Sequence, residues 1–229
     1  MAEVSVEVSA TDCTDLAKVL VRADPGGALA AALDVPFGRA VRDGNDALVV
    51  RTAPDAWLLL AAADLATPLV RRVEALGAGE FASVVDVTHG HALARLTGTT
   101  AAVVLAKLCA IDLADPATPD GNTFRSLVAG VAVTVVRDDA RPGRLTAGSA
   151  GATPAGGRDA RPGRLTVSPT ASLASLDRSD ALGSAGATPA GGRDAERERS
   201  YLLLCDRSYR QYLRDVLTDA GEEFGLAWT

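Results

Sequence analysis

The sequence predicts an α+β protein, and three observations support this. Segments with strand-like and helix-like spacing alternate along the chain, and short turns join several strands as hairpins. Hydrophobic residues make up 48% of the 229 residues, which is enough to bury a core. Aromatic residues make up only 4%, so the core must consist mainly of Ala, Val and Leu. We therefore expect an antiparallel or mixed sheet with helices on one face.

The residues before position 80 supply the first elements. Val4–Val8 alternates apolar and polar residues, as a half-buried strand does. A helix is expected to begin at Thr67-Pro68, with Thr67 as its cap, and to end at Leu76 before Gly77. The other expected elements are an apolar segment at Ala17–Val21, a turn at Asp24–Gly27, a short helix at Ala28–Leu33, and a hairpin of Ala47–Thr52 with Trp57–Ala61.

The rest of the chain continues the same alternation. Asp206 is expected to cap an amphipathic helix that runs to about Phe224. The remaining expected elements are strands Phe81–Val87 and Ala92–Leu96 around the turn Thr88-His89-Gly90, a helix Thr100–Cys109 capped by Gly98-Thr99, strands Ser126–Val128 and Val131–Val136 around Gly130, and strand Tyr201–Cys205.

A low-complexity block interrupts this order between residues 138 and 199. It contains the string DARPGRLT twice, and no aromatic residue lies between Phe124 and Tyr201. Such a segment has too little apolar surface to offset the entropy of ordering it. We expect residues 1–137 to form the domain, 138–199 to be a disordered insertion, and 200–229 to complete the same domain.

The insertion can be interpreted in two ways, and its position also predicts which strands are neighbours. It is either a flexible tether or docking arm, or a tolerated surface expansion, and the low entropic cost of lengthening a loop favours the expansion. Long insertions survive at exposed turns between elements. Val131–Arg137 and Tyr201–Cys205 should therefore be adjacent strands.

Charge and cysteine content exclude several classes of protein. The net charge of -6, without a basic patch, argues against binding nucleic acid. The first residues carry acid where a signal peptide carries base, and no apolar run approaches the length of a membrane span. Cys13, Cys109 and Cys205 are odd in number and far apart, which argues against disulfides or structural zinc. These features indicate a reduced, cytoplasmic protein.

No motif indicates a self-sufficient active site. The sequence has no G-x-G-x-x-G, no Walker loop and no G-x-S-x-G elbow in a suitable context. His89 and His91 with Asp86 could share a metal, although the set lacks a fourth ligand and a typical spacing. The plainer alternative is a turn in which one imidazole packs against the backbone and the other is exposed. His91 could also act as a general base, but no partner for it is evident.

Each of three further residues, Cys109, Cys205 and Trp57, can be interpreted as functional or as structural. Cys109 ends an apolar helix and is expected to be a small core residue. The helix N-terminus that follows Cys205 could activate its thiol, but its place at the end of an apolar strand favours burial. Trp57 is expected to anchor the core.

Three stretches, in this order, resemble one known family. They are Ala53-Pro54-Asp55-Ala56-Trp57-Leu58-Leu59; Asp86-Val87-Thr88-His89-Gly90 with Ala92–Gly98 and Ala101–Leu108; and Arg207-Ser208-Tyr209-Arg210-Gln211-Tyr212-Leu213 with Asp219–Gly225. They are similar to the glycine-cleavage T-protein family of folate-binding folds, and within it to the gamma subunits of heterotetrameric sarcosine oxidase. The likeness covers most of the chain outside the low-complexity block.

The resemblance implies a short T-protein-like α+β fold and a set of partners. These would be an alpha subunit with NAD and a folate-binding domain, a beta subunit with FAD and covalently bound FMN, and a zinc-binding delta subunit. Such a complex converts sarcosine to glycine, with hydrogen peroxide and, from tetrahydrofolate, 5,10-methylenetetrahydrofolate. The gamma subunit carries no cofactor, so the resemblance implies no catalytic, cofactor-binding or metal-binding residue in this chain.

The sequence departs from the family pattern at informative places. Ala53 stands where the family has Gly, and Ala56 where it has Glu. Catalytic T-proteins have an acid after the central helix, whereas the matching segment here, Gly121–Leu127, has none. This favours a non-catalytic subunit over a stand-alone folate-dependent aminomethyltransferase. The alternative would need a carboxylate such as that of Asp86, which is better placed to hold its own turn by Asx-type hydrogen bonds.

Overall fold

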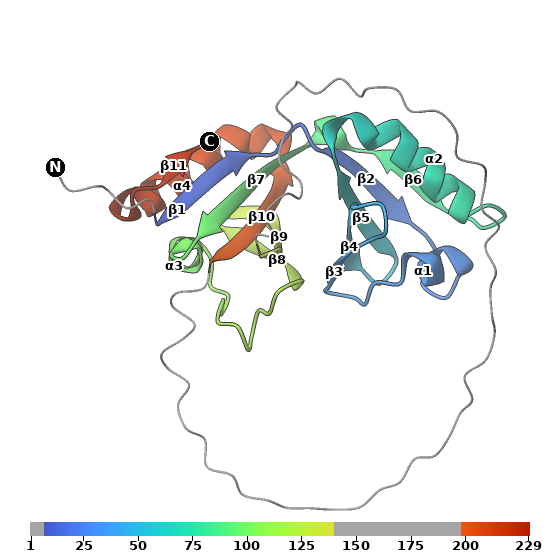
Figure 1. The fold of residues 1–229 in the computed structure, drawn as a ribbon, viewed down its shortest axis with the longest axis horizontal. Helices are drawn as coiled ribbons and strands as arrows, with labels where there is room; N and C mark the ends of the chain where they lie inside the picture. Colours follow the sequence, from blue (N-terminus) through green and yellow to red (C-terminus); the bar gives the residue numbers. More distant parts are fainter. Residues whose placement is uncertain (1–6, 140–197) are drawn as a thin grey trace, which may run out of the picture. The chain divides into compact units, whose positions relative to one another are not determined.

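The computed structural model describes residues 7–139 and 198–229, and within them the chain forms two sheets rather than the single sheet expected. The first sheet has the strand order β11-β1-β7-β10-β9-β8, and the second has the order β3-β4-β5-β2-β6 (Figure 1). The fold class is nevertheless α+β, as predicted.

The first sheet is mixed, because β1 pairs with β11 in parallel and its other neighbours are antiparallel. Helices α3 (Ala101–Ala106) and α4 (Arg210–Gly221) cover one of its faces through buried residues such as Leu105 and Leu217. Its strands are β1 (Val8–Asp12), β7 (His91–Gly98), β8 (Thr123–Val128), β9 (Val131–Arg137), β10 (Arg199–Asp206) and β11 (Ala227–Trp228).

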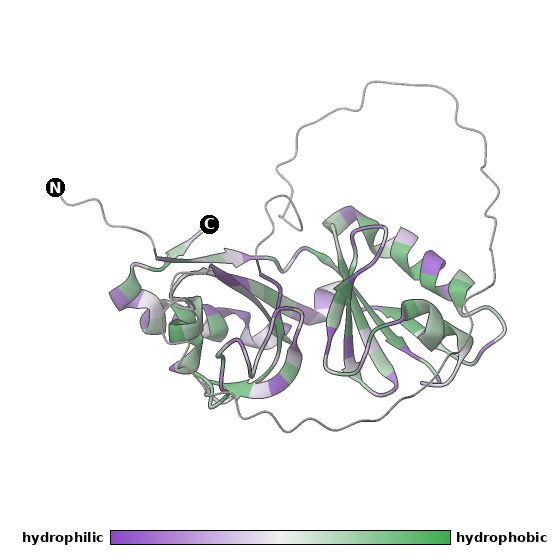
Figure 2. Cartoon of the chain, turned by 60° about the horizontal axis from the view of Figure 1, so that its bottom comes forward, coloured by the Kyte–Doolittle hydropathy of each residue, from purple (hydrophilic) through white to green (hydrophobic). Residues whose placement is uncertain are grey.

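The second sheet is antiparallel throughout. Helices α1 (Ala28–Leu33) and α2 (Ala66–Leu76) cover one face, on which the fully buried Trp57 anchors the core as expected. Helix α2 carries both hydrophobic and hydrophilic residues, as an amphipathic surface helix does (Figure 2). The strands are β2 (Ala17–Arg22), β3 (Ala40–Arg42), β4 (Leu48–Ala53), β5 (Ala56–Ala61) and β6 (Ser83–Asp86).

The faces of the two sheets that the helices do not cover pack against each other. They form a third hydrophobic core, in addition to the core beneath the helices of each sheet. Leu58 and Leu60 of β5 lie there with Leu93 of β7 and Leu202 of β10. Because β5 has helices on one side and the other sheet on the other, all six of its residues are buried. This explains why the sequence at Ala56–Ala61 is a continuous apolar run instead of an alternating one.

One strand prediction needs correction. The strand expected at Val4–Val8 begins only at Val8, and residues 4–6 lie outside the described part of the chain. The strands predicted around Thr88-His89-Gly90 are present as β6 and β7, but β6 pairs with β2 whereas β7 pairs with β1 and β10. The 3-10 turn at Thr88–Gly90 instead carries the chain from one sheet into the other.

The helix boundaries are partly as predicted. Gly77 ends α2, but Thr67 is inside the helix, which begins at Ala66 after a 3-10 turn at Ala63–Leu65. The helix expected at Thr100–Cys109 is shorter, and no side chain caps it. Asp206 does act as a cap, since its carboxylate accepts a hydrogen bond from the Ser208 N–H. The cap serves a 3-10 turn at Arg207–Tyr209 that leads into α4, and a second 3-10 turn at Glu222–Phe224 follows that helix.

The predicted adjacency of the strands that flank the low-complexity block is confirmed. Strands β9 and β10 pair antiparallel, with Tyr201 opposite Arg137. The disorder expected for the block concerns residues outside the described part of the chain, apart from its two ends.

Candidate functional site

A cavity of about 380 Å³ lies between the two sheets and is the place where separate stretches of the sequence converge. Val87 and His91 reach it from the crossing between the sheets, and Ala53 and Ala56 from the β4–β5 hairpin. From the first sheet come β8, with Thr123–Arg125, and residues of β9 and β10. The cavity therefore brings together three regions singled out in the sequence: 53–59, 86–98 and 121–127.

The charged side chains that line the cavity are all basic. They are Arg22, Arg51 and Arg125, and no Asp or Glu of residues 7–139 and 198–229 belongs to the lining. Arg22 pairs with Asp55 at 2.9 Å, in an exposed ion pair. Neither Arg51 nor Arg125 forms an ion pair with a described residue. The cavity thus has a local excess of positive charge in a chain whose net charge is -6.

Arg51 is held in place by neutral groups. Its guanidinium donates to the carbonyl oxygens of Val35, at 3.2 Å, and Pro54, at 2.6 Å. It also lies over the indole of Trp57, 4.8 Å from the ring centroid. Its Nε is buried without a hydrogen-bond partner in the structure. These contacts orient the cation without neutralising it.

The turn that carries the two histidines is built by Asp86. Its carboxylate accepts a hydrogen bond from the Thr88 N–H at 2.9 Å, and hydrogen bonds from Thr88 hold the pKa of Asp86 below its usual value. Thr88 is buried, and its hydroxyl oxygen accepts the Lys18 N–H at 3.0 Å. Asp86 therefore holds the turn by an Asx-type hydrogen bond, as predicted, and it does not line the cavity.

The histidines lie in different surroundings. His89 is exposed, whereas His91 is half-buried, lines the cavity and places Nδ1 3.5 Å from the Val87 carbonyl oxygen. Within residues 7–139 and 198–229, no three His, Cys, Asp or Glu side chains come together as a metal site would require. The arrangement matches the plainer alternative, in which one imidazole packs against the backbone and the other is exposed.

The cysteines are buried free thiols. Cys109 lies in the core that α3 and α4 cover, as predicted for a small core residue. Burial, and next to it the charge of Asp206, raises the pKa of Cys205 to about 11. Cys205 is only 2% exposed, so the prediction of burial is confirmed. Burial also raises the pKa of Cys13.

A buried lysine supports the crossing between the sheets. Lys18 of β2 is fully buried, and its ammonium donates to the carbonyl oxygens of Thr14, at 2.7 Å, and Leu16, at 2.9 Å. Burial lowers the pKa of Lys18 to about 8, against the opposing influence of Asp15. The side chain holds the connection between β1 and β2 and is inaccessible from solvent, so it is a structural residue.

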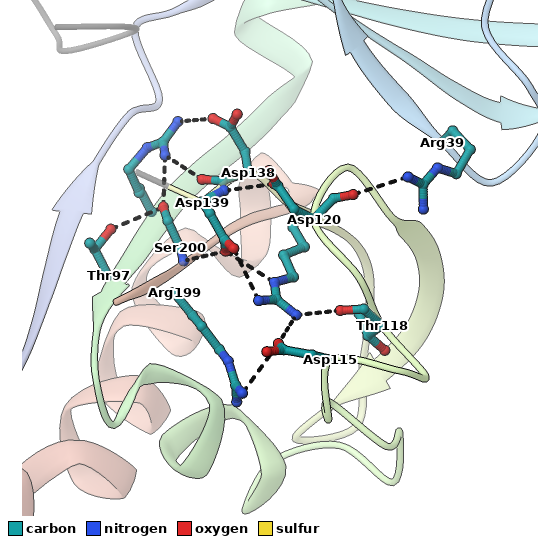
Figure 3. Close-up of polar contacts among 11 residues, drawn as sticks. Arg39, Thr97, Asp115, Thr118, Asp120, Asp138, Asp139, Arg199 and Ser200 are labelled. Carbon is teal, nitrogen blue, oxygen red and sulfur yellow. Dashed lines mark hydrogen bonds and ion pairs between the residues drawn. The ribbon is translucent and has the colours of Figure 1, made fainter. Parts of the chain in front are cut away.

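A network of ion pairs lies at the ends of β9 and β10, close to where the described chain breaks off and resumes (Figure 3). Asp138 binds two arginines, Arg95 of β7 at 2.8 Å and Arg42 of β3 at 2.7 Å, so one carboxylate links the two sheets. The side chains of these three residues are 13–15% exposed. Because solvent screens such pairs weakly, this contact contributes to the join between the sheets.

Arg137 is the most deeply buried member of the network, with a side chain only 1% exposed. Its guanidinium pairs with Asp115 at 2.6 Å and with Asp139 at 3.0 Å, and it donates to the Thr118 carbonyl oxygen. Arg199 also reaches Asp115, at 3.2 Å. Hydrogen bonds and charge from the two arginines, acting against burial, hold the pKa of Asp115 below its usual value. The network joins the loop before β8 to the ends of β9 and β10.

The basic side chains of the cavity were not predicted from the sequence. Arg125 lies in the segment 121–127, which was singled out only for its lack of acid. Arg51 and Arg22 are in strands whose apolar residues dominated the pattern. No local sequence signal distinguishes these three arginines from the others, because they come together only when the two sheets pack against each other.

Two packed sheets, each with helices on its outer face, together define a T-protein-like α+β fold. The similar solved structures are of that kind. A chain of heterotetrameric sarcosine oxidase from Corynebacterium sp. U-96 matches 97% of this chain and 88% of its own length, with a TM-score of 0.63 and 19% identity. Glycine cleavage system aminomethyltransferase T from Bartonella henselae matches 99% of this chain and 48% of its own length, with a TM-score of 0.55 and 12% identity.

These two proteins belong to the two groups that the sequence motifs resemble, and at such low identity they show the fold. No protein-family model matches the sequence, and no curated protein matches it either. Among the residues that the structure describes, none of the helices is long and apolar enough to span a membrane.

Proposed function

We propose that this chain is a non-catalytic gamma-type subunit of a heterotetrameric sarcosine oxidase in the cytoplasm. The observation that carries the proposal is the cavity between the sheets, because the motif regions meet there and none of the described lining residues is a carboxylate. The fold supports it, since a chain of a heterotetrameric sarcosine oxidase matches this one over nearly its whole length. The complex would convert sarcosine to glycine, with hydrogen peroxide and 5,10-methylenetetrahydrofolate as the other products.

The partners follow from the same proposal. Alpha, beta and delta subunits would hold NAD, FAD, FMN, tetrahydrofolate and zinc, and this chain would hold none of them. Its cavity has basic groups, and the described part of the chain places no acid there that could exchange protons with a folate. Its part would be to complete the assembly.

An affinity purification of the tagged full chain from its native cells tests this proposal. Flavin absorbance and mass spectrometry of the co-purified proteins are the readouts. We expect a flavoprotein with a folate-type subunit that turns over sarcosine only as the complex. Recovery of the chain alone, or turnover of sarcosine or folate by the isolated chain, would contradict the proposal.

A second candidate is a stand-alone, folate-binding aminomethyltransferase-like protein. The presence of a cavity with three arginines favours it, because basic groups suit an anionic ligand. Titration of the purified chain with tetrahydrofolate in a calorimeter separates the candidates. Tight binding by a chain that recovers no partners would support the second one.

A further inference from the structure

Within the part of the chain that the structure describes, strand β8 is an edge strand of the first sheet and borders the cavity. It pairs with β9 on one side and ends the strand order on the other. The Arg137 N–H donates to the Asn122 carbonyl oxygen, so the carbonyl group of Asn122 points toward β9. Alternation along an antiparallel strand then points the backbone groups of Thr123, Arg125 and Leu127 outward.

The first part of this outer edge is already used by the chain itself. The Thr123 N–H donates to the Gly38 carbonyl oxygen at 2.9 Å, and Arg39 and Asn122 form an antiparallel bridge. An extended segment thus already pairs with the beginning of β8. The edge continues beyond it at Arg125 and Leu127, whose outward backbone groups pair with no strand of the described residues.

The side chains along this edge combine positive charge with exposed apolar surface. Arg125 is exposed and lines the cavity together with Arg51, and neither arginine forms an ion pair with a described residue. Leu127 lies on the same side of the strand as Arg125, and its exposed fraction is 61%. Phe37, at the cavity, is also 61% exposed.

We propose that an extended, acidic segment of a partner subunit adds to the free edge of β8 and places a carboxylate between Arg125 and Arg51. Backbone pairing at Arg125 and Leu127 would give affinity, and the carboxylate would give selectivity. Because the rest of the chain is acidic overall, such a segment is repelled elsewhere and attracted here. A small anion would leave Leu127 and the strand edge uncovered, which is why a protein segment fits better.

This inference rests on the proposed function. One variant tests the docking at β8 separately from the proposed function. Arg125→Glu reverses the charge at an exposed side chain that makes no ion pair with the described residues, so folding should be unaffected. The matched control is Arg71→Glu, an equal charge change on the exposed side of α2. Partner subunits produced without this chain are immobilised, and binding of each variant is measured by interferometry.

We expect Arg125→Glu to weaken binding at least about tenfold and Arg71→Glu to change it less than about twofold. Equal binding by wild type and Arg125→Glu would overturn the β8 proposal while the subunit proposal stands. Absence of any partner for the wild-type chain would overturn both. Thermal melting of each variant distinguishes lost binding from lost folding, and Leu127→Ser supplies a second, uncharged test at the same edge.

Cross-linking identifies the acidic segment itself. In the complex assembled with the Arg125→Lys variant, a zero-length carbodiimide joins an amine to a carboxylate in contact with it. Mass spectrometry should find position 125 linked to an Asp or Glu of a partner subunit. Links only within this chain, or none at that position, would contradict the proposal.

Discussion

Arg137 combines deep burial with two carboxylate partners, Asp115 and Asp139. Replacing it by Met would leave these partners without their cation in a site that water reaches poorly. We expect Arg137→Met to lower the free energy of unfolding by about 3 kcal/mol, as breakage of buried ion pairs does. Urea denaturation followed by circular dichroism measures the change.

Arg22→Met is the control, because it removes the same kind of side chain from an exposed ion pair. Arg22 and Asp55 are 60% and 48% exposed, so this substitution should cost less than about 1 kcal/mol. Equal losses for the two variants would mean that burial does not strengthen the network around Arg137.

The roles of residues that interact with near neighbours in the sequence were predictable. The roles of residues that depend on partners far away in the sequence were not. The Asx-type hydrogen bond of Asp86 and the cap at Asp206 involve an N–H only two residues further along the chain. Arg51 and Arg125 are 74 positions apart and meet only at the cavity. No local pattern links two such residues, so their shared site could not be predicted.

At the scale of elements, the β8–β9 hairpin contains an unfavourable turn residue. Ala129 and Gly130 both have positive φ, 47° and 82°, as the two residues of a type I′ turn do. Ala is poor at the first position, where Asn is preferred because it tolerates the left-handed region. We expect Ala129→Asn to raise the free energy of unfolding by about 0.5–1 kcal/mol, measured by urea denaturation.

The same substitution at Ala132 is the comparison, since this residue is exposed but lies within β9, where Asn is disfavoured. Ala132→Asn should be neutral or destabilising. Destabilisation by Ala129→Asn would show that the turn geometry is not the determining factor.

Elements with strong local signals in the sequence were predicted, whereas the pairing partners of β6 and β7 were not. The hairpins at β4–β5 and β8–β9 follow from apolar runs around turn residues. Strands β6 and β7 also flank a turn, but they pair with β2 and β10 in different sheets. A turn of three residues is compatible with a hairpin and also with a crossing from one sheet to another. Burial of the apolar faces of both strands decides which of the two forms.

At the scale of the whole molecule, the ends of the low-complexity block are held together. The Asp138 N–H donates to the Ser200 carbonyl oxygen at 2.9 Å, next to the pairing of Arg137 with Tyr201. We expect that replacing residues 140–197 by a Gly/Ser loop of about five residues keeps the melting temperature within about 3 °C or raises it, because a shorter loop costs less entropy to close. Differential scanning calorimetry measures this.

Partner binding by this deletion variant separates the two interpretations of the block. Unchanged binding supports a tolerated surface expansion, whereas loss of binding by a chain that still melts normally would identify the block as a docking arm. A chain whose β9–β10 hairpin cannot close without residues 140–197 would contradict the expected stability.

The sequence alone determined the fold class, most elements, the resemblance to the T-protein family and the absence of an acid in the segment 121–127. These properties depend on residue types and on neighbours within about ten positions, where periodicity and turn chemistry act. Only the tertiary structure decided that the described residues form two sheets, that basic residues meet in a cavity between them, and that Asp138 links Arg42 to Arg95. The reason is that contacts between distant strands arise from burial of apolar faces against each other, and their register has no signature within a single segment.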